Sequence, residues 1–146
     1  MVYAPQIVEK AYAKTKEFDI YEYVFSRVEK LPIREEYVEH AIAIAEKYEI
    51  SLEELARTIT CESGWTQRGS GKWGLLSGKA GELGILQYKL GTWLAFEKEF
   101  KQEELVIKDA FDQITLTAIA FANDKKNHWS CYLKYYEPKL YKKYFP

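Results

Sequence analysis

Apolar residues recur along this chain at helical spacing, and no stretch shows the alternation that is typical of a β-strand. The pattern predicts about seven helices and therefore an all-α fold. Pro5 and Asp19 are start signals, Pro32 is a break, and Thr92 and Asp109 are the expected caps of two later helices. The expected helices span residues 5–16, 19–30, 34–48, 52–62, 92–100 and 109–122, and the last lies within residues 127–146.

The helix over residues 52–62 carries the most informative side chain. Ser51 and Glu54 have the spacing of a capping box at its start. Its apolar positions are Leu52, Leu55, Ala56 and Ile59. The same spacing brings Glu62 onto the apolar face, next to the loop that begins at Gly64, and burial there should raise its pKa. Such a carboxyl holds a proton near neutral pH, as glycoside cleavage requires. The alternative is a carboxylate that faces water.

Residues 64–82 contain six glycines in nineteen positions. This composition predicts a long mobile loop or a short irregular hairpin, and loops of that length are usually functional or disordered. Trp65 and Trp73 favour a role facing the substrate, because aromatic rings stack on the apolar faces of sugars. The alternative is that these indoles form a local core under the loop.

Two short motifs resemble the soluble lytic transglycosylase family, which is related to goose-type lysozyme. They are Cys61-Glu62-Ser63-Gly64-Trp65 and Gly81-Glu82-Leu83-Gly84-Ile85-Leu86-Gln87. The family reads Glu-Ser, then Gly-Ala-x-Gly-Leu-Met-Gln, then a Thr-hydrophobic pair, which matches Thr92-Trp93 here. Glu82 stands where the family has alanine. The family segment Ala-Tyr-Asn-Ala-Gly has its nearest match at residues 120–124, where Phe121 replaces the tyrosine and Asn123 is displaced by one place.

The resemblance covers about residues 50–131 and implies a lysozyme-like domain with a loop-rich or short-hairpin cleft, preceded by N-terminal helices over residues 1–49. It implies an enzyme that cuts peptidoglycan between N-acetylmuramic acid and N-acetylglucosamine. Glu62 is then the general acid and base. The substrate-binding candidates are Ser63, Trp65, Trp73, Gln87, Phe121 and Asn123.

The resemblance favours a mechanism with one carboxylate. Glu62 protonates the glycosidic oxygen and then takes the C6 hydroxyl proton of the same sugar, which gives a 1,6-anhydro product. Glu82 is a candidate second carboxylate: it would hold a water in an inverting hydrolase, with the two carboxyls about 6.5 to 9.5 Å apart. We slightly favour Glu82 as a cap of the following turn. A wall-binding module without catalysis and an enzyme that cleaves chitin oligomers are further alternatives.

Cys61 and Cys131 are the two cysteines, 70 positions apart. A disulfide between them would tie the Glu62 helix to the C-terminal region, and two buried free thiols are the alternative. A Cys/His hydrolase is disfavoured because His128 is only three residues from Cys131 in sequence and His40 lies on a charged helix start. No metal or cofactor pattern is present, so we expect neither.

The length of 146 residues, with 47% hydrophobic and 29% charged, fits one domain over residues 1–146, which we expect to be monomeric. The net charge of −1 argues against nucleic acid as a partner. No run of 18 apolar residues and no signal peptide is present, so we expect no stable membrane insertion. The expected location is extracellular, periplasmic or phage-delivered to the cell wall.

Residues 127–146 carry four lysines and one acidic residue, Glu137, together with five tyrosines. This segment has the charge to contact an anionic wall polymer. We favour instead a terminal helix whose aromatic rings pack inward and whose lysines are solvated.

Overall fold

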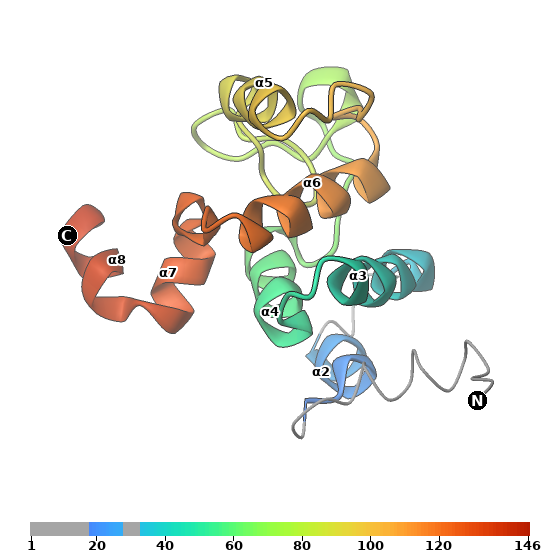
Figure 1. The fold of residues 1–146 in the computed structure, drawn as a ribbon, viewed down its shortest axis with the longest axis vertical. Coiled ribbons are helices and arrows are strands. Elements are labelled where there is room, and N and C mark those ends of the chain that lie inside the picture. Colours follow the sequence, from blue (N-terminus) through green and yellow to red (C-terminus); the bar gives the residue numbers. More distant parts are fainter. Residues whose placement is uncertain (1–17, 28–32) are drawn as a thin grey trace.

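A computed structural model describes residues 18–27 and 33–146, and this part of the chain is mainly helical, which confirms the all-α prediction (Figure 1). Its α-helices are α2 (Ile20–Arg27), α3 (Glu35–Lys47), α4 (Leu52–Ser63), α5 (Leu90–Glu99), α6 (Ala110–Ala122), α7 (Ser130–Tyr136) and α8 (Pro138–Tyr144). Two 3-10 turns are η2 (Lys72–Gly74) and η3 (Lys126–His128). The helix predicted over residues 5–16 lies outside the described residues. None of the described helices is long and apolar enough to cross a bilayer.

Local signals set the ends of the helix that carries Glu62. At the start of α4, Ser51 Oγ accepts a hydrogen bond from the Glu54 backbone N–H (3.1 Å), as the capping-box spacing predicts. The Glu54 carboxylate binds Lys126 Nζ at 2.7 Å. At the other end, Gly64 adopts the left-handed conformation with φ of 61°, which an L-residue adopts at a cost. The chain therefore leaves the helix two residues after Glu62.

The structure confirms one predicted helix boundary and corrects two others. Asp109 caps α6, where its carboxylate accepts hydrogen bonds from the backbone N–H groups of Phe111 and Asp112. Thr92, in contrast, does not cap α5, because that helix already begins at Leu90 and its N-cap residue is Lys89. The single terminal helix is also wrong, since the segment forms α7 and α8 with proline at the first position of α8.

Helix α6 is the central element, as its apolar pattern predicts. It packs against α3 and α5, and α4 packs in turn against α3 and α7. Nine of the thirteen residues of α6 are buried, including Gln113 and Thr117. The core contains the largest fully buried side chains: Ile20, Ile42, Leu55, Ile59, Leu75, Ile85, Leu86, Tyr88, Trp93, Ile114 and Leu116.

The segment from Gly64 to Lys89 folds as an irregular hairpin with isolated antiparallel bridges, Arg68 with Leu75 and Leu83 with both Ser77 and Tyr88. Buried amide side chains fix the turn over residues 84–87, called the inner turn below. Gln67 Oε1 accepts from the Ile85 N–H (2.7 Å), and Gln113 Oε1 accepts from the Leu86 N–H (2.9 Å). The sequence motif that ends at Gln87 is therefore held against the centre of the fold.

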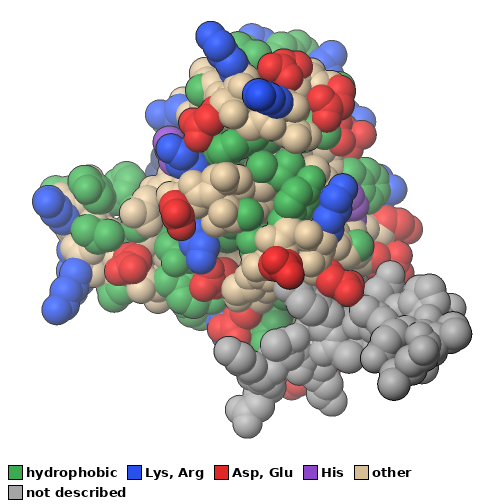
Figure 2. All heavy atoms as spheres, in the orientation of Figure 1, with side chains coloured by type: hydrophobic (Ala, Val, Ile, Leu, Met, Phe, Trp, Pro, Cys, Tyr) green, Lys and Arg blue, Asp and Glu red, His purple; other side chains and the backbone are tan. Residues whose placement is uncertain are grey.

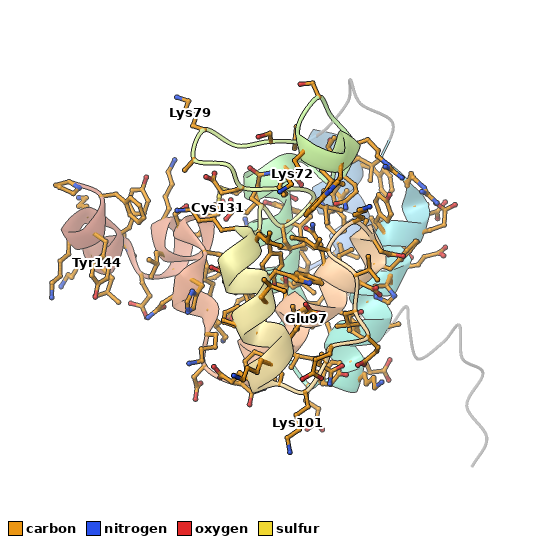
Figure 3. The ribbon with its side chains drawn as sticks, turned by 90° about the horizontal axis from the view of Figure 1, so that it is seen from above. Lys72, Lys79, Glu97, Lys101, Cys131 and Tyr144 are labelled. Carbon is orange, nitrogen blue, oxygen red and sulfur yellow. A yellow bond between two sulfur atoms is a disulfide. The ribbon has the colours of Figure 1, made fainter. Side chains whose placement is uncertain are left out.

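Helices α7 and α8 form the end of the molecule that projects from the helical body (Figures 1 and 2). Seen from above, Tyr144 lies at the outer edge of this projection (Figure 3). Helix α7 packs on α4, whereas α8 packs on α7 and has no buried residue.

Candidate active site

Glu62 lies on the wall of a cavity of about 460 Å³. The cavity is formed by the last turn of α4, the part of the hairpin segment that follows Gly78, the start of α5, and the segment that leads into α7. Its wall comprises Glu62, Ala80, Glu82, Gln87, Tyr88, Lys89, Thr92, Asn127, His128, Trp129, Ser130 and Phe145. A pocket of this size is in the range that holds small ligands and pieces of a polymer chain.

The environment of Glu62 raises its pKa to about 7. Burial is the main cause, because removal from water disfavours the charged carboxylate. The negative charge of Glu82 also raises the pKa, while a backbone hydrogen bond from Cys131 lowers it. The predicted shift is therefore present in the structure: near neutral pH this carboxyl exchanges a proton readily, which suits an acid that later acts as a base.

Glu82 lies on the wall of the same cavity as Glu62. Its Oε1 is buried and has no hydrogen-bond partner within the described residues, so this oxygen does not cap the following turn. The turn that follows Glu82 is closed by backbone groups, with the Gln87 N–H donating to the Gly84 carbonyl (3.1 Å). The arrangement brings two carboxyls to one cavity and leaves one oxygen of Glu82 unused by the fold.

Gln87 also lines the cavity, as its place in the motif predicts. Its Nε2 donates to the Gly84 carbonyl (2.9 Å) and the Leu76 carbonyl (3.3 Å), which orients the amide. A Cβ atom on Gly78 would lie 2.5 Å from Gln87 Oε1 and 2.2 Å from Glu82 Oε2. Both oxygens therefore pack against the bare backbone of this glycine.

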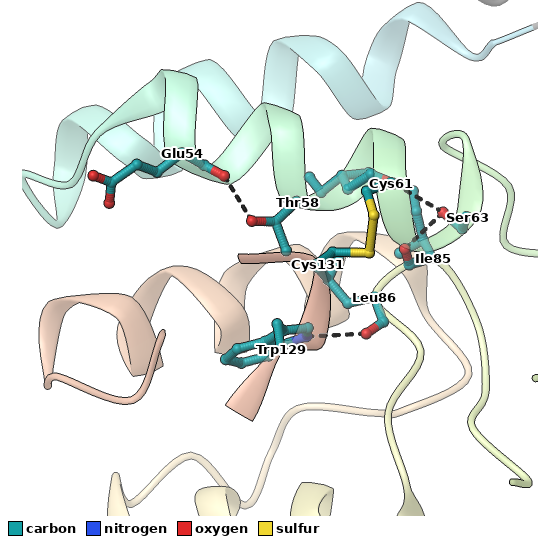
Figure 4. Close-up of a disulfide and its surroundings, with 9 residues drawn as sticks. Glu54, Thr58, Cys61, Ser63, Ile85, Leu86, Trp129 and Cys131 are labelled. Carbon is teal, nitrogen blue, oxygen red and sulfur yellow. Dashed lines mark hydrogen bonds between the residues drawn. A yellow bond between two sulfur atoms is a disulfide. The ribbon is translucent and has the colours of Figure 1, made fainter. Parts of the chain in front are cut away.

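Ser63 has a structural place instead of a cavity position. Its Oγ donates a hydrogen bond to the Ile85 carbonyl (2.7 Å) and accepts one from the Thr66 N–H (3.3 Å). These bonds join the end of α4 to the inner turn (Figure 4). The two sequence motifs are thus brought together by Ser63, which does not line the cavity as the predicted substrate contact would.

Three other predicted substrate contacts lie outside the cavity wall. Trp65 is 2% exposed and its Nε1 donates to Thr60 Oγ1 (2.9 Å), so the alternative of a local core holds for this indole. Phe121 is also 2% exposed and packs edge-on against Trp129, with ring centroids 5.4 Å apart. Asn123 ends α6 and donates to the Ile119 carbonyl (2.8 Å).

Trp73 is 40% exposed but does not line the Glu62 cavity. Its ring lies beneath Lys72 Nζ (4.5 Å to the centroid) and Lys108 Nζ (5.5 Å). Lys108 borders a second hollow of about 450 Å³. Its wall is formed by the segment that leads into α6 and the first residues of that helix, by the start of the hairpin segment, and by two residues at the start of α3: Val106, Lys108, Asp109, Ala110, Phe111, Gln67, Arg68, Arg34 and Tyr37. Trp73 is therefore exposed as predicted, at a different place from the candidate acid.

Cys61 and Cys131 form a disulfide with Cα atoms 5.8 Å apart, which decides against the alternative of two free thiols (Figure 4). Both sulfur atoms are consumed, so neither cysteine is a nucleophile. The bond holds the first turn of α7 against the end of α4. Trp129 reinforces this contact by donating from Nε1 to the Leu86 carbonyl (3.1 Å).

Several cavity residues were not predicted from the sequence: Lys89, Asn127, His128, Ser130 and Phe145. Asn127, His128 and Ser130 could have been predicted from the possible disulfide, because a bond between Cys61 and Cys131 forces residues 127–130 to lie beside Glu62. The pKa of His128 is lowered by burial and by the charge of Lys125. Phe145 had no local signal.

Within residues 18–27 and 33–146, no cluster of three His, Cys, Asp or Glu side chains is arranged to hold a metal ion. Comparison of the chain with protein-family models, curated proteins and solved structures gave no match. A function for this chain therefore has to be argued from the chemistry of its cavity.

Proposed function

We propose that this protein is a lytic transglycosylase that cleaves the β-1,4 bond between N-acetylmuramic acid and N-acetylglucosamine in peptidoglycan. The observation that supports this most is Glu62, a carboxyl on the wall of a 460 Å³ cavity with a pKa of about 7. A group with that pKa is protonated in a large fraction of molecules at neutral pH and is also a competent base once it has lost its proton. Such an enzyme would act at the cell wall, outside the cytoplasm.

The proposed reaction uses Glu62 twice. The protonated carboxyl donates its proton to the glycosidic oxygen as the bond from C1 to that oxygen breaks. The carboxylate then takes the proton of the C6 hydroxyl, whose oxygen bonds to C1 and closes the 1,6-anhydro ring. Attack from within the same sugar needs no positioned water, and its effective concentration is high. The resemblance of both motifs to the soluble lytic transglycosylases supports this order of events.

Glu82 has a place in this reaction without accepting a proton. Positive charge develops on the sugar ring as the glycosidic bond breaks, because the transition state resembles an oxocarbenium ion. A negative charge on the same cavity wall stabilises that state, and it does so more strongly where water is excluded. The charge of Glu82 reaches this cavity, since it raises the pKa of Glu62.

Hydrolysis is the second candidate, and the unpartnered Oε1 of Glu82 is the observation that favours it. A buried acceptor without a donor is suited to hold a water, and a water activated there would attack C1. The products would then carry a reducing end. A glycan-binding module without turnover is the remaining alternative from the sequence, and it gives Glu62 no need for a raised pKa.

Mass spectrometry of purified peptidoglycan after digestion tests the proposal. We expect muropeptides that end in 1,6-anhydromuramic acid from the wild type and none from Glu62→Gln, with far-UV circular dichroism showing that the variant is folded. The matched control is Glu104→Gln, an exposed carboxyl outside the cavity. Reducing ends that depend on Glu82 would assign hydrolysis instead. Binding of strands without any product would contradict both reactions.

A further inference from the structure

Helix α8 lies beside the candidate active site and exposes its side chains. Phe145, which follows the helix, reaches the wall of the Glu62 cavity although it is 52% exposed. Tyr144 next to it is 59% exposed. No residue of α8 is buried, and the helix contacts the rest of the molecule mainly through α7. This surface is therefore continuous with the cavity and is not needed to cover the core.

Helix α8 itself carries only positive side-chain charges, and the exposed acid Glu137 is its N-cap residue. Residues 138–146 contain Lys139, Lys142 and Lys143 and no acidic residue. All three lysines are exposed, and none takes part in an ion pair within the described residues. Figure 2 shows the lysine and hydrophobic side chains gathered on this projecting end of the molecule. The charge of these lysines is available to a ligand.

Aromatic rings lie among the lysines. Tyr141 and Phe145 are stacked with ring centroids 5.2 Å apart, and Lys143 Nζ lies 5.8 Å from the centroid of the Tyr144 ring. Such rings offer faces for the apolar sides of sugars, and the ammonium groups offer donors for carboxylates. The prediction that the tyrosines of this segment pack inward is thus wrong for Tyr144, where the exposed ring stands beside a cation.

We infer that α8 is a binding arm for the carboxylate-bearing stem peptides of the glycan strand whose sugars occupy the cavity. The inference rests on the proposed function and specifies its substrate as an acidic, peptide-bearing glycan, in contrast to neutral chitin oligomers. Stem peptides branch from the muramic sugars on the strand, so a strand held at Glu62 presents their carboxylates next to the cavity mouth. The lysines of α8 are the exposed, unpaired cations beside Phe145.

The test is a binding measurement with peptidoglycan strands that keep their stem peptides and with strands from which an amidase has removed them. Both are measured in the Glu62→Gln background, so that no cleavage interferes. We expect Lys142→Ser with Lys143→Ser to weaken binding of stem-bearing strands by about 3- to 10-fold at low salt, as for exposed charge pairs. The effect should shrink at 0.5 M salt because the charges are screened. Binding of stem-free strands should change by less than about twofold.

The matched control replaces Lys98 and Lys101 by serine. Both are exposed, and Lys101 is well separated from Tyr144 (Figure 3). An equal loss in both double variants would reduce the effect to net charge and overturn the inference. So would an equal loss on both kinds of strand, or a loss seen only with walls that carry phosphate polymers. Failure of the proposed function is distinct: the wild type would then bind these strands without cutting them.

Discussion

Glu82 lies on the wall of the same cavity as Glu62, and its negative charge adds to burial in raising the pKa of Glu62 to about 7. The two carboxyls differ in their surroundings, since Glu62 lies near the end of a helix against the core and Glu82 lies in the hairpin segment. A pair of carboxyls with different environments is how glycosidases separate the proton donor from the stabilising charge.

The pH dependence of turnover should report the pKa of Glu62. Because only the protonated carboxyl donates to the leaving oxygen, kcat/KM should fall as the pH rises through about 7. Glu82→Gln removes a charge that raises this pKa, so the alkaline limb should move to lower pH. The measurement is the rate of clearing of a peptidoglycan suspension between about pH 5 and about pH 9, a range that brackets the pKa of Glu62.

Two basic side chains also line the cavity, His128 and Lys89, and His128 needs its own control. The pKa of His128 is lowered from its ordinary value of 6.5, so it titrates on the acidic side of Glu62. A His128→Gln variant should therefore keep the alkaline limb in place. If that variant moves the limb and Glu82→Gln does not, the assignment to Glu62 is wrong.

Stability should show the cost of keeping Glu62 buried. Its pKa is about 7 in the folded protein against an ordinary value of 4.5, so between these values the folded state binds more protons than the unfolded state. The free energy of unfolding therefore falls as the pH rises through this window, by up to about 3 kcal/mol from this group. Glu62→Gln removes the effect. Urea unfolding should find the variant more stable than wild type at about pH 8, above the folded pKa of Glu62. The two should be equally stable at about pH 4, below the unfolded pKa.

Replacing Gly78 should lower activity while leaving folding nearly unchanged. A methyl group there meets the oxygens of Glu82 and Gln87 at 2.2 and 2.5 Å, and these flexible side chains can turn away. We expect Gly78→Ala to lower kcat by about tenfold or more, because displaced catalytic groups lose their geometry. Gly91→Ala is the control, since a Cβ there meets nothing within 4 Å. Full activity in Gly78→Ala would show that neither oxygen has to stay where it lies.

The disulfide should support both stability and the cavity. It closes a loop of 70 residues, and loop entropy sets its contribution at up to about 4 kcal/mol. Cys61 is exposed, so replacing both cysteines by alanine leaves little void in the core. The double variant should lose stability in urea and also lose activity, because residues 127–130 would no longer be fixed beside Glu62. Reduction of the wild type by dithiothreitol should reproduce both losses; unchanged unfolding after reduction would contradict the prediction.

Local sequence determined the helix that carries Glu62 almost completely. The Ser51 cap, the apolar face and the release at Gly64 each depend on residues within a few positions, and each is found as expected. The cap of α6 by Asp109 is local in the same way. The split between α7 and α8 was equally readable, since proline favours the first position of a helix and residues before it avoid helical backbone angles.

What the sequence did not determine is which side chains share the cavity. Trp65 and Trp73 are both tryptophans in one glycine-rich segment, yet one is buried under it and the other is exposed beside Lys108. Phe121 lies on the central helix but faces Trp129 and not the cavity. These outcomes depend on contacts between distant segments, which no local spacing encodes.

The sequence by itself therefore determined an all-α chain and a carboxyl at the buried end of a helix, because helical periodicity and capping are short-range effects. Tertiary structure alone placed Glu82 on the wall that Glu62 shares and brought Phe145 to its edge. The physical reason is that a cavity is defined by the packing of whole elements against one another, and its charge and depth exist only once those elements meet.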